Sequence, residues 1–329
     1  MRYTISFALA TALGFAGAAG AEVPKVVTDM VPVQGLVAMV MGDLGQPQVL
    51  LDRGANVHSF QMRPSQAAKL AGSGLVVWIG PQMAPWLDQA ITGTAPDVAQ
   101  LRLIGVPGTH LQDFGAASGP HDYDEHDHGA EAAHDGEDHT AEAGAEPAGH
   151  EGHSHEGLDP HAWLDPANGA LWLDAIAAEL ARLDPENAVT YGANAAAGKA
   201  RIAAADQAIA AQLTPVQGKP IVVFHDAYGY FSGHYGVTVA GSVALGDAAS
   251  PGAARLAALR DTAAGGGALC LFPEAGHDPK LVTQLAEATG ATVGGVLDPE
   301  GAAVEPGPGA YLAVLQGLAD TLTGCLTKG

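Results

Sequence analysis

Two blocks of alternating strand-like and helix-like runs limit this chain to a small set of folds. The first block contains the apolar runs VVT, QVLL, LVVW and LRLIGV, separated by segments with apolar residues at helical spacing. The second block repeats this order with IVVFHDAYGYF, GVTVAGSV, ALCLF and ATVGGVLD, the last ending at Asp298. Strands that alternate with helices form parallel sheets through right-handed crossovers. The sequence therefore predicts an α/β protein with two lobes, each with a mainly parallel sheet flanked by helices.

An Ala-rich stretch connects the two blocks. It contains AVTYGANAAAGKARIAAADQAIAAQL, and a helix of about thirty residues would be on the order of 40 Å long. We expect this helix to act as a rigid spine that limits hinge motion. The predicted organisation is an N-terminal lobe over 22–165, helices including the long linker over 166–213, and a C-terminal lobe over 214–329.

The first 21 residues predict a cleaved export signal. Arg2 supplies a positive charge, residues 5–17 are apolar, and Ala19, Gly20 and Ala21 have the small-residue pattern of a cleavage site. The mature protein should then begin near Glu22. With 14 Lys+Arg against 36 Asp+Glu, the net charge of −22 argues against nucleic acid or an anionic membrane as the partner. An acidic protein attracts cations instead.

Much of this charge lies in one segment, residues 121–156. It holds twelve acidic residues, eight of the fourteen histidines and no Lys or Arg. Because it has no aliphatic side chain larger than Ala, we expect a disordered loop. His-rich tracts bind metal, so the loop is predicted to capture metal with modest affinity. The histidines are His121, His126, His128, His134, His139, His150, His153 and His155.

Three other histidines occur beside apolar or strand-like runs. His58 lies in GANVHSFQMRPSQ, His161 in DPHAWLDP and His225 in FHDAYGYF. A single histidine is more often a hydrogen-bonded structural residue than a ligand. Three neutral imidazoles that converge from distant parts of a chain, however, form a set that zinc accepts well.

These three motifs and GVLDPEG occur in an order and at separations that resemble the solute-binding proteins of bacterial metal ABC importers, specifically the zinc-uptake branch. The resemblance covers nearly the whole mature chain, and the acidic His-rich insertion is similar too. It implies a periplasmic monomer that carries Zn²⁺ in a cleft between two lobes and delivers it to a membrane permease. It leaves open whether a periplasmic zinc chaperone loads the protein.

The resemblance places the first three metal ligands at His58, His161 and His225. An imidazole at position 225 is typical of the zinc branch, since the manganese branch tends to have a carboxylate there. Asp298 matches the aspartate ligand of many relatives and is the expected fourth ligand, with water as the alternative. Some relatives use a Glu directly before the first His, but this chain has Val57.

Three further acidic residues are expected to support the site rather than bind the ion, and a fourth has a separate role. Glu274 is predicted to have a supporting or structural role. Asp159 and Asp226 could accept hydrogen bonds from ring N–H groups of the ligands. Asp165 is expected to start a helix.

The two cysteines, Cys270 and Cys325, favour one disulfide in an exported protein. Such a bond would tie the strand ALCLF to the last helix, and the zinc-uptake branch has a similar cysteine pair. Two thiolate zinc ligands would be the rival interpretation, although no CxxC pairing supports them.

Three rival functions fit parts of the same sequence. Three imidazoles and an open position would suit a zinc hydrolase, but the HExxH sequence of zinc peptidases is absent. A metal-dependent surface adhesin is the second rival, and no sequence signature decides it. A manganese-type paralogue is the third. The prediction is a zinc carrier and not an enzyme.

Overall fold

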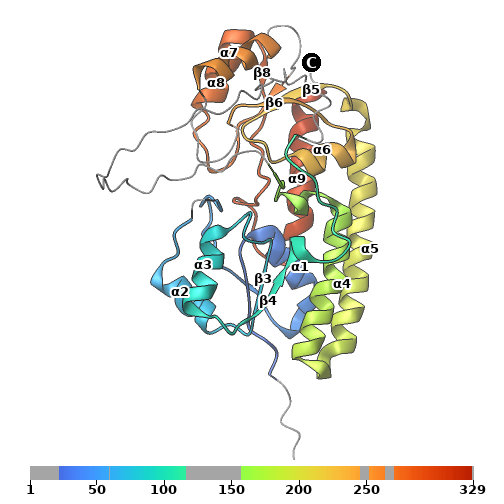
Figure 1. The fold of residues 1–329 in the computed structure, drawn as a ribbon. Helices are drawn as coiled ribbons and strands as arrows, with labels where there is room; N and C mark the ends of the chain where they lie inside the picture. Colours follow the sequence, from blue (N-terminus) through green and yellow to red (C-terminus); the bar gives the residue numbers. More distant parts are fainter. Residues whose placement is uncertain (1–21, 59, 116–156, 245–251, 264–269, 328–329) are drawn as a thin grey trace, which may run out of the picture.

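Two four-stranded parallel sheets organise the molecule into two lobes (Figure 1). The computed structural model describes residues 22–58, 60–115, 157–244, 252–263 and 270–327. The strand orders are β2-β1-β3-β4 and β6-β5-β7-β8, so the second sheet repeats the topology of the first. The predicted α/β class with two lobes is therefore confirmed.

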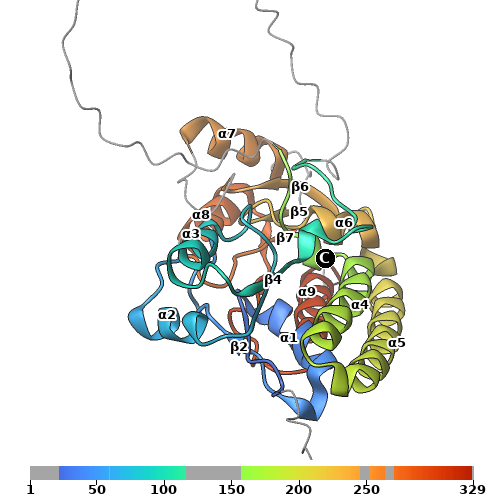
Figure 2. The same ribbon diagram turned by 60° about the horizontal axis from the view of Figure 1, so that its bottom comes forward.

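The N-terminal sheet is covered on both faces, as its continuous apolar strands require. All four residues of β3 are buried, and Figure 2 shows α2 and α3 on the opposite side of the sheet from α4 and α5. The strand expected over LRLIGV starts earlier, and a short 3-10 turn follows it at Leu103–Gly105. The elements of this lobe are β1 (Val26–Thr28), α1 (Val31–Met41), β2 (Gln48–Val49), α2 (Pro64–Ala71), β3 (Leu75–Trp78), α3 (Pro85–Thr94) and β4 (Ala99–Arg102).

The C-terminal sheet has shorter strands than the sequence indicates. The expected strand through His225 is wrong in its extent, because the strand ends at Val223 and the YGYF part forms a turn and the start of a helix. The elements are β5 (Pro220–Val223), α6 (Gly229–Tyr235), β6 (Thr238–Ser242), α7 (Ala253–Thr262), β7 (Cys270–Leu271), α8 (Lys280–Thr289) and β8 (Thr292–Val293).

The last strand also ends before the predicted Asp298. Gly294, directly after β8, packs so closely on the ring of Phe272 that a side chain would not fit there. The chain rejoins the sheet only as a bridge between Glu274 and Leu297, where Leu297 N–H donates to the Pro273 carbonyl at 2.9 Å. Asp298 therefore lies in a turn and not at the end of a regular strand.

Three long helices, α4 (Pro166–Leu183), α5 (Ala188–Leu213) and α9 (Ala310–Leu326), pack beside the lobes together with α1. The predicted long helix is α5, whose 26 residues span about 39 Å, and Figure 1 shows it running along both lobes. A methyl group on Gly35 of α1 would lie 2.6 Å from the backbone nitrogen of Tyr311 in α9. Glycine at this position therefore permits the close approach of these two helices.

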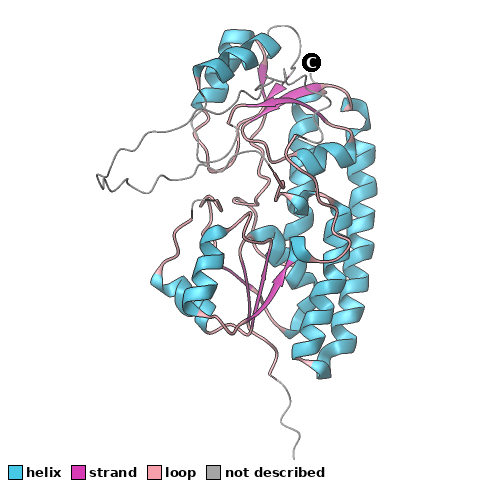
Figure 3. Cartoon of the chain, in the orientation of Figure 1, coloured by secondary structure: helices cyan, strands magenta, loops and turns pink. Residues whose placement is uncertain are grey.

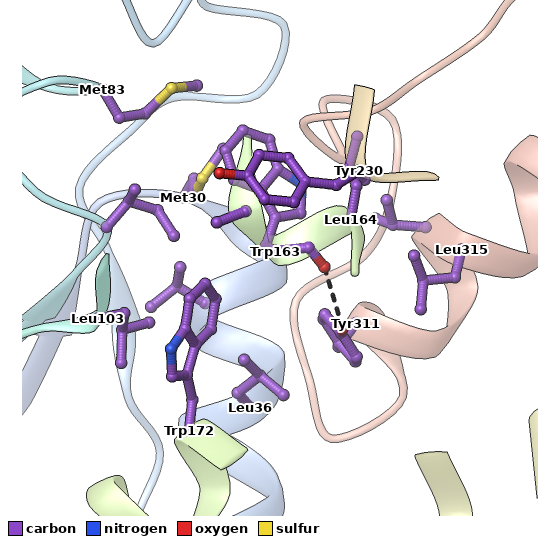
Figure 4. Close-up of a cluster of buried hydrophobic side chains, with 14 of the residues drawn as sticks. Met30, Leu36, Met83, Leu103, Trp163, Leu164, Trp172, Tyr230, Tyr311 and Leu315 are labelled. Carbon is purple, nitrogen blue, oxygen red and sulfur yellow. Dashed lines mark hydrogen bonds between the residues drawn. The ribbon is translucent and has the colours of Figure 1, made fainter. Parts of the chain in front are cut away.

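One apolar core extends from the N-terminal sheet through these helices to β5. Its centre includes Met30, Trp163, Trp172 and Tyr311, and the Tyr311 hydroxyl donates a hydrogen bond of 2.9 Å to the Trp163 carbonyl (Figure 4). A second, smaller cluster lies within the C-terminal lobe. Because the lobes share the larger core, relative motion between them would disrupt packing.

The predicted disulfide joins Cys270 of β7 to Cys325 of α9. It closes a loop of 55 residues and fixes the C-terminal sheet to the helices. Among the described residues, no helix has the length and apolar character that a membrane crossing needs.

Candidate metal centre

The structure brings together the three histidines that the sequence singled out. The Nε2 atoms of His161 and His225 are 3.4 Å apart, and one ring nitrogen of His58 completes a set of atoms that all lie within 4.8 Å of one another. His161 and His225 are each 1% exposed, while the side chain of His58 is 14% exposed. Mainly loops fill the region where the two lobes face each other (Figure 3).

Each histidine lies beside a helix or strand or on the connection between two of them. His225 comes two residues after β5, at the carboxyl end of a parallel strand, where such sheets place ligands. His161 precedes a 3-10 turn that leads into α4, and Asp165 caps this helix by accepting the Ala167 N–H at 2.8 Å. His58 lies on the connection between β2 and α2. The helix-starting role predicted for Asp165 is confirmed.

The loop that carries His58 is held from both lobes. The indole Nε1–H of Trp86 donates to the Val57 carbonyl at 2.6 Å, and the His58 N–H donates to Asn56 Oδ1 at 2.9 Å. Arg53 forms an ion pair with Glu305 of the C-terminal lobe at 2.5 Å. His58 is thus presented from the N-terminal lobe by a segment that already contacts the other lobe.

The other two histidine motifs bind each other. The hydroxyl of Tyr230, from the FHDAYGYF motif, donates to the Asp159 carbonyl at 2.9 Å and accepts from the Gln112 N–H at 3.1 Å. The Trp163 indole, from DPHAWLDP, donates to the Pro299 carbonyl at 2.8 Å. These bonds explain why the aromatic residues of the motifs accompany the histidines: they set the distances between them.

Buried carboxylates orient the two deeper imidazoles. Asp159 Oδ1 lies 2.7 Å from Nδ1 of His161, and Glu274 Oε1 lies 2.5 Å from Nδ1 of His225. Because a carboxylate accepts, both ring protons are assigned to Nδ1, and the lone pairs of both Nε2 atoms face each other. A cation between the two nitrogens removes this repulsion. Ligands about 2.0–2.1 Å from a tetrahedral zinc ion lie about 3.3–3.4 Å apart, which matches the observed separation.

Glu274 connects further groups to this network. Its Oε2 accepts the Tyr228 hydroxyl at 2.8 Å, and its Oε1 lies 3.5 Å from Nε2 of His277. Burial, with the charge of Glu274, raises the pKa of Tyr228 well above 10, so this residue stays a donor. Burial also lowers the pKa of His277, against the opposing effect of Glu274. The contacts agree with the supporting role expected for Glu274.

The GVLDPEG loop contributes two carboxylates near the site. Both oxygens of Asp298 accept backbone N–H groups, from Ala302 at 2.7 Å and Ala303 at 2.9 Å, and its role as fourth ligand stays a prediction. Glu300 Oε1 lies 3.7 Å from Nε2 of His58. Glu300 was not predicted from the sequence, although a carboxylate between Pro and Gly beside a predicted ligand was a visible signal.

The environment of Glu300 disfavours its charge. Burial is the largest cause that raises the pKa of this carboxyl to about 8, and the nearby charges of Glu274 and Asp298 add to it. A hydrogen bond from the Val57 backbone acts in the opposite direction. The carboxylate form would be stabilised by a neighbouring cation.

The other described histidines make contacts outside the three-histidine group. His110 Nδ1 is 2.8 Å from Asp165, and His234 Nε2 is 2.8 Å from Asp206, so both act in structural contacts. Within the described ranges, a second metal-capable group combines His225 with Glu274 and His277. The eight loop histidines all fall outside the described residues: His121, His126, His128, His134, His139, His150, His153 and His155.

Three imidazoles at the meeting point of two α/β lobes, joined by a rigid helix, define a metal-binding solute-binding protein. The sequence comparisons agree. Residues 26–325 match the family described as "Zinc-uptake complex component A periplasmic", and the chain belongs to that family. It is thus a periplasmic zinc-binding component of a zinc uptake system whose partner is an ABC permease.

Curated relatives match over almost their whole length. The chain is 50% identical over 322 residues to the high-affinity zinc uptake system protein ZnuA of Paracoccus denitrificans, covering 98% of each chain. It is 36% identical over 334 residues to the protein of the same name from Brucella suis, covering 99% of each.

Solved structures share the fold. A crystal structure of ZnuA aligns with a TM-score of 0.69 and 24% identity over 92% of this chain and 98% of that one. The laminin-binding adhesin of Streptococcus agalactiae aligns with a TM-score of 0.69 and 21% identity, over 92% and 99% of the two chains. At these identities the similarity to the solved structures shows the fold alone.

Proposed function

We propose that this protein binds one Zn²⁺ ion tightly through Nε2 atoms of His58, His161 and His225, and delivers it to the permease of an ABC importer. The observation that carries this proposal is the facing pair of imidazole nitrogens at 3.4 Å, with His58 beside them. The curated relatives named for high-affinity zinc uptake support the same cargo.

The donor set supports zinc over manganese. Imidazole is a softer donor than carboxylate and suits zinc, whereas oxygen-rich sites suit manganese. The hydrogen bond of His161 to Asp159 and the short contact of His225 Nδ1 with Glu274 also increase the basicity of the ligating nitrogens. Both features strengthen binding of an ion that prefers nitrogen.

The burial of the site supports transport over catalysis. A zinc hydrolase has to admit a substrate to a metal-bound water, but His161 and His225 are each only 1% exposed. We therefore propose a non-enzymatic, monomeric carrier. Purified zinc-loaded protein should not turn over ester or peptide substrates, and zinc-dependent turnover abolished by H161A would contradict the proposal.

Residues 1–21 and 121–156 complete the proposal, although both lie outside the described residues. We propose that residues 1–21 direct export and are cleaved. The acidic His-rich segment would then collect zinc weakly, because eight imidazoles and twelve carboxylates attract the cation.

Chelator-competition titration of zinc into the metal-free protein tests the proposed site. Wild type should show one tight site, and H161A should lose it. H110A is the control, because His110 is an exposed histidine whose ring contacts Asp165 rather than the other imidazoles. A tight site retained in H161A would overturn the proposed function.

A further inference from the structure

Hydrogen bonding accounts for only part of the Glu300 carboxyl, which has a hydrogen bond from the Val57 backbone. Its side chain is 10% exposed, and its Oε1 lies 3.7 Å from Nε2 of His58. This oxygen has no hydrogen-bond partner within the described part of the chain. A buried carboxylate oxygen without a partner is costly, so its retention needs an explanation.

The loop holds Glu300 in place from both sides. The carbonyl of the preceding Pro299 accepts the Trp163 indole N–H, and Asp298 accepts two backbone N–H groups from the residues that follow. Gly301 adopts a positive φ of +73°, which ordinary side chains rarely adopt, so it allows the turn directly after Glu300. Glu300 is therefore directed toward the imidazoles by a braced turn.

Two separations at this site are close to the distance between two ligands of one ion, and the donor atoms that all lie within 4.8 Å of one another are those of the three histidines. Ligands of a tetrahedral zinc ion are separated by about 3.3–3.4 Å. The two observed separations are 3.4 Å between His161 and His225 and 3.7 Å between His58 and Glu300. The pairs come from different segments, yet both are close to the separation that a bound ion requires.

We propose that a carboxylate oxygen of Glu300 is the fourth ligand of the ion, completing a set of three imidazoles and one carboxylate. This inference rests on the proposed function, since it deepens the description of the same site. It assigns Asp298 to bracing the turn. With four protein ligands, a tetrahedral ion has no position for a bound water, and a carrier needs no such water.

Zinc affinities of wild type, E300Q and D298N test the assignment. Gln keeps the shape of the side chain but removes its charge. Groups that only orient ligands change metal affinity by about 10- to 100-fold, so E300Q should lose at least this much. D298N should lose less than E300Q, and an E300Q affinity equal to wild type would overturn the proposal.

A second measurement separates ligation from a structural role. Metal-free E300Q should unfold at the same temperature as metal-free wild type or a higher one, because the amide, like the neutral carboxyl that burial favours, places no charge in the buried site. A clearly lower unfolding temperature would instead mean that the carboxylate holds the loop, and would contradict ligation.

The zinc-loaded crystal structure identifies the ligand directly. We expect a Glu300 oxygen about 2.0–2.2 Å from the ion. Water or Asp298 in that place would overturn the assignment while leaving the three imidazoles as the site. If H161A kept its tight zinc, the proposed function itself would fail, so the two failures are distinguishable.

Discussion

The first strand of each sheet ends in a different kind of buried polar residue. β1 and β5 hold the same place in their sheets, beside β2 and β3 or β6 and β7. Asp29 follows β1, and its carboxylate accepts the N–H groups of Met30 at 2.8 Å and Ile79 at 2.9 Å. His225 follows β5 and directs Nε2 toward His161.

The difference shows what topology decides and what the side chain decides. In both lobes the carboxyl end of this strand lies where a polar group can be buried. Asp29 uses its two oxygens to accept backbone N–H groups and so completes the N-terminal lobe. His225 has one nitrogen against Glu274 and the other against a second imidazole, which leaves a place for an ion. Equivalent positions therefore serve structure in one lobe and binding in the other.

The largest expected effect is the contrast between H225A and D29N in zinc binding. H225A should weaken zinc binding by more than about 100-fold, beyond the range for groups that only orient ligands. D29N should bind zinc as wild type does. Chelator competition on the metal-free proteins measures both, and equal effects of the two substitutions would break the comparison.

A smaller loss of zinc affinity is expected for E274Q. Gln can still accept from Nδ1 of His225, but the ligand loses the support of a negative charge. The expected loss is about 10-fold or more. Y228F is the matched control, because it removes only the hydroxyl that donates to Glu274. A Y228F affinity lower than that of E274Q would contradict this role of the carboxylate.

The difference in stability between wild type and D29N should depend on pH in a defined direction. Burial raises the pKa of Asp29 from 3.8 to about 7, although its N–H partners oppose the rise. Between these values the folded state keeps a proton that the unfolded state has lost. The contribution of Asp29 to the free energy of unfolding should therefore fall as pH rises from about 4 to 7, by up to about 1.4 kcal/mol per pH unit.

D29N lacks this titration, so its deficit relative to wild type should be largest near pH 4 and shrink toward pH 7. Denaturant unfolding of the metal-free proteins across this range measures the difference. A deficit that grows with pH would mean that Asp29 is charged and paired in the folded state.

The smallest effect on the tight site is expected from deletion of residues 121–156. The deletion should remove several weak sites while the affinity of the tight site changes by less than about 10-fold. Calorimetry on wild type and the deletion variant compares the two classes of site. If the deletion variant had no tight site, tight binding would depend on the His-rich segment rather than on the three histidines between the lobes, which would contradict this prediction.

Much of the fold was readable from local patterns. Continuous apolar runs such as residues 75–78 predicted buried strands, the Ala-rich stretch predicted α5, and the cysteine count predicted the disulfide. The C-terminal ends of the strands were harder to predict from the sequence. The last strand stops at Val293, directly before Gly294 packs on Phe272, and such a contact depends on tertiary structure rather than on periodicity.

The site was predictable to the extent that its residues form motifs. The three histidines carried recognisable neighbours, and the structure brings them together. Glu300 was missed because its direction is set by a hydrogen bond between Trp163 and Pro299, residues 136 positions apart. No local pattern indicates which of the two carboxylates in LDPEG faces the imidazoles.

X-ray absorption at the zinc edge tests the central claim most directly. The protein without residues 121–156, loaded with one equivalent of zinc, contains only the ion of the tight site. We predict three imidazole nitrogens at about 2.0–2.1 Å, with the outer-ring scattering that histidine produces. A spectrum with one imidazole or none would contradict an ion held between the two lobes by His58, His161 and His225.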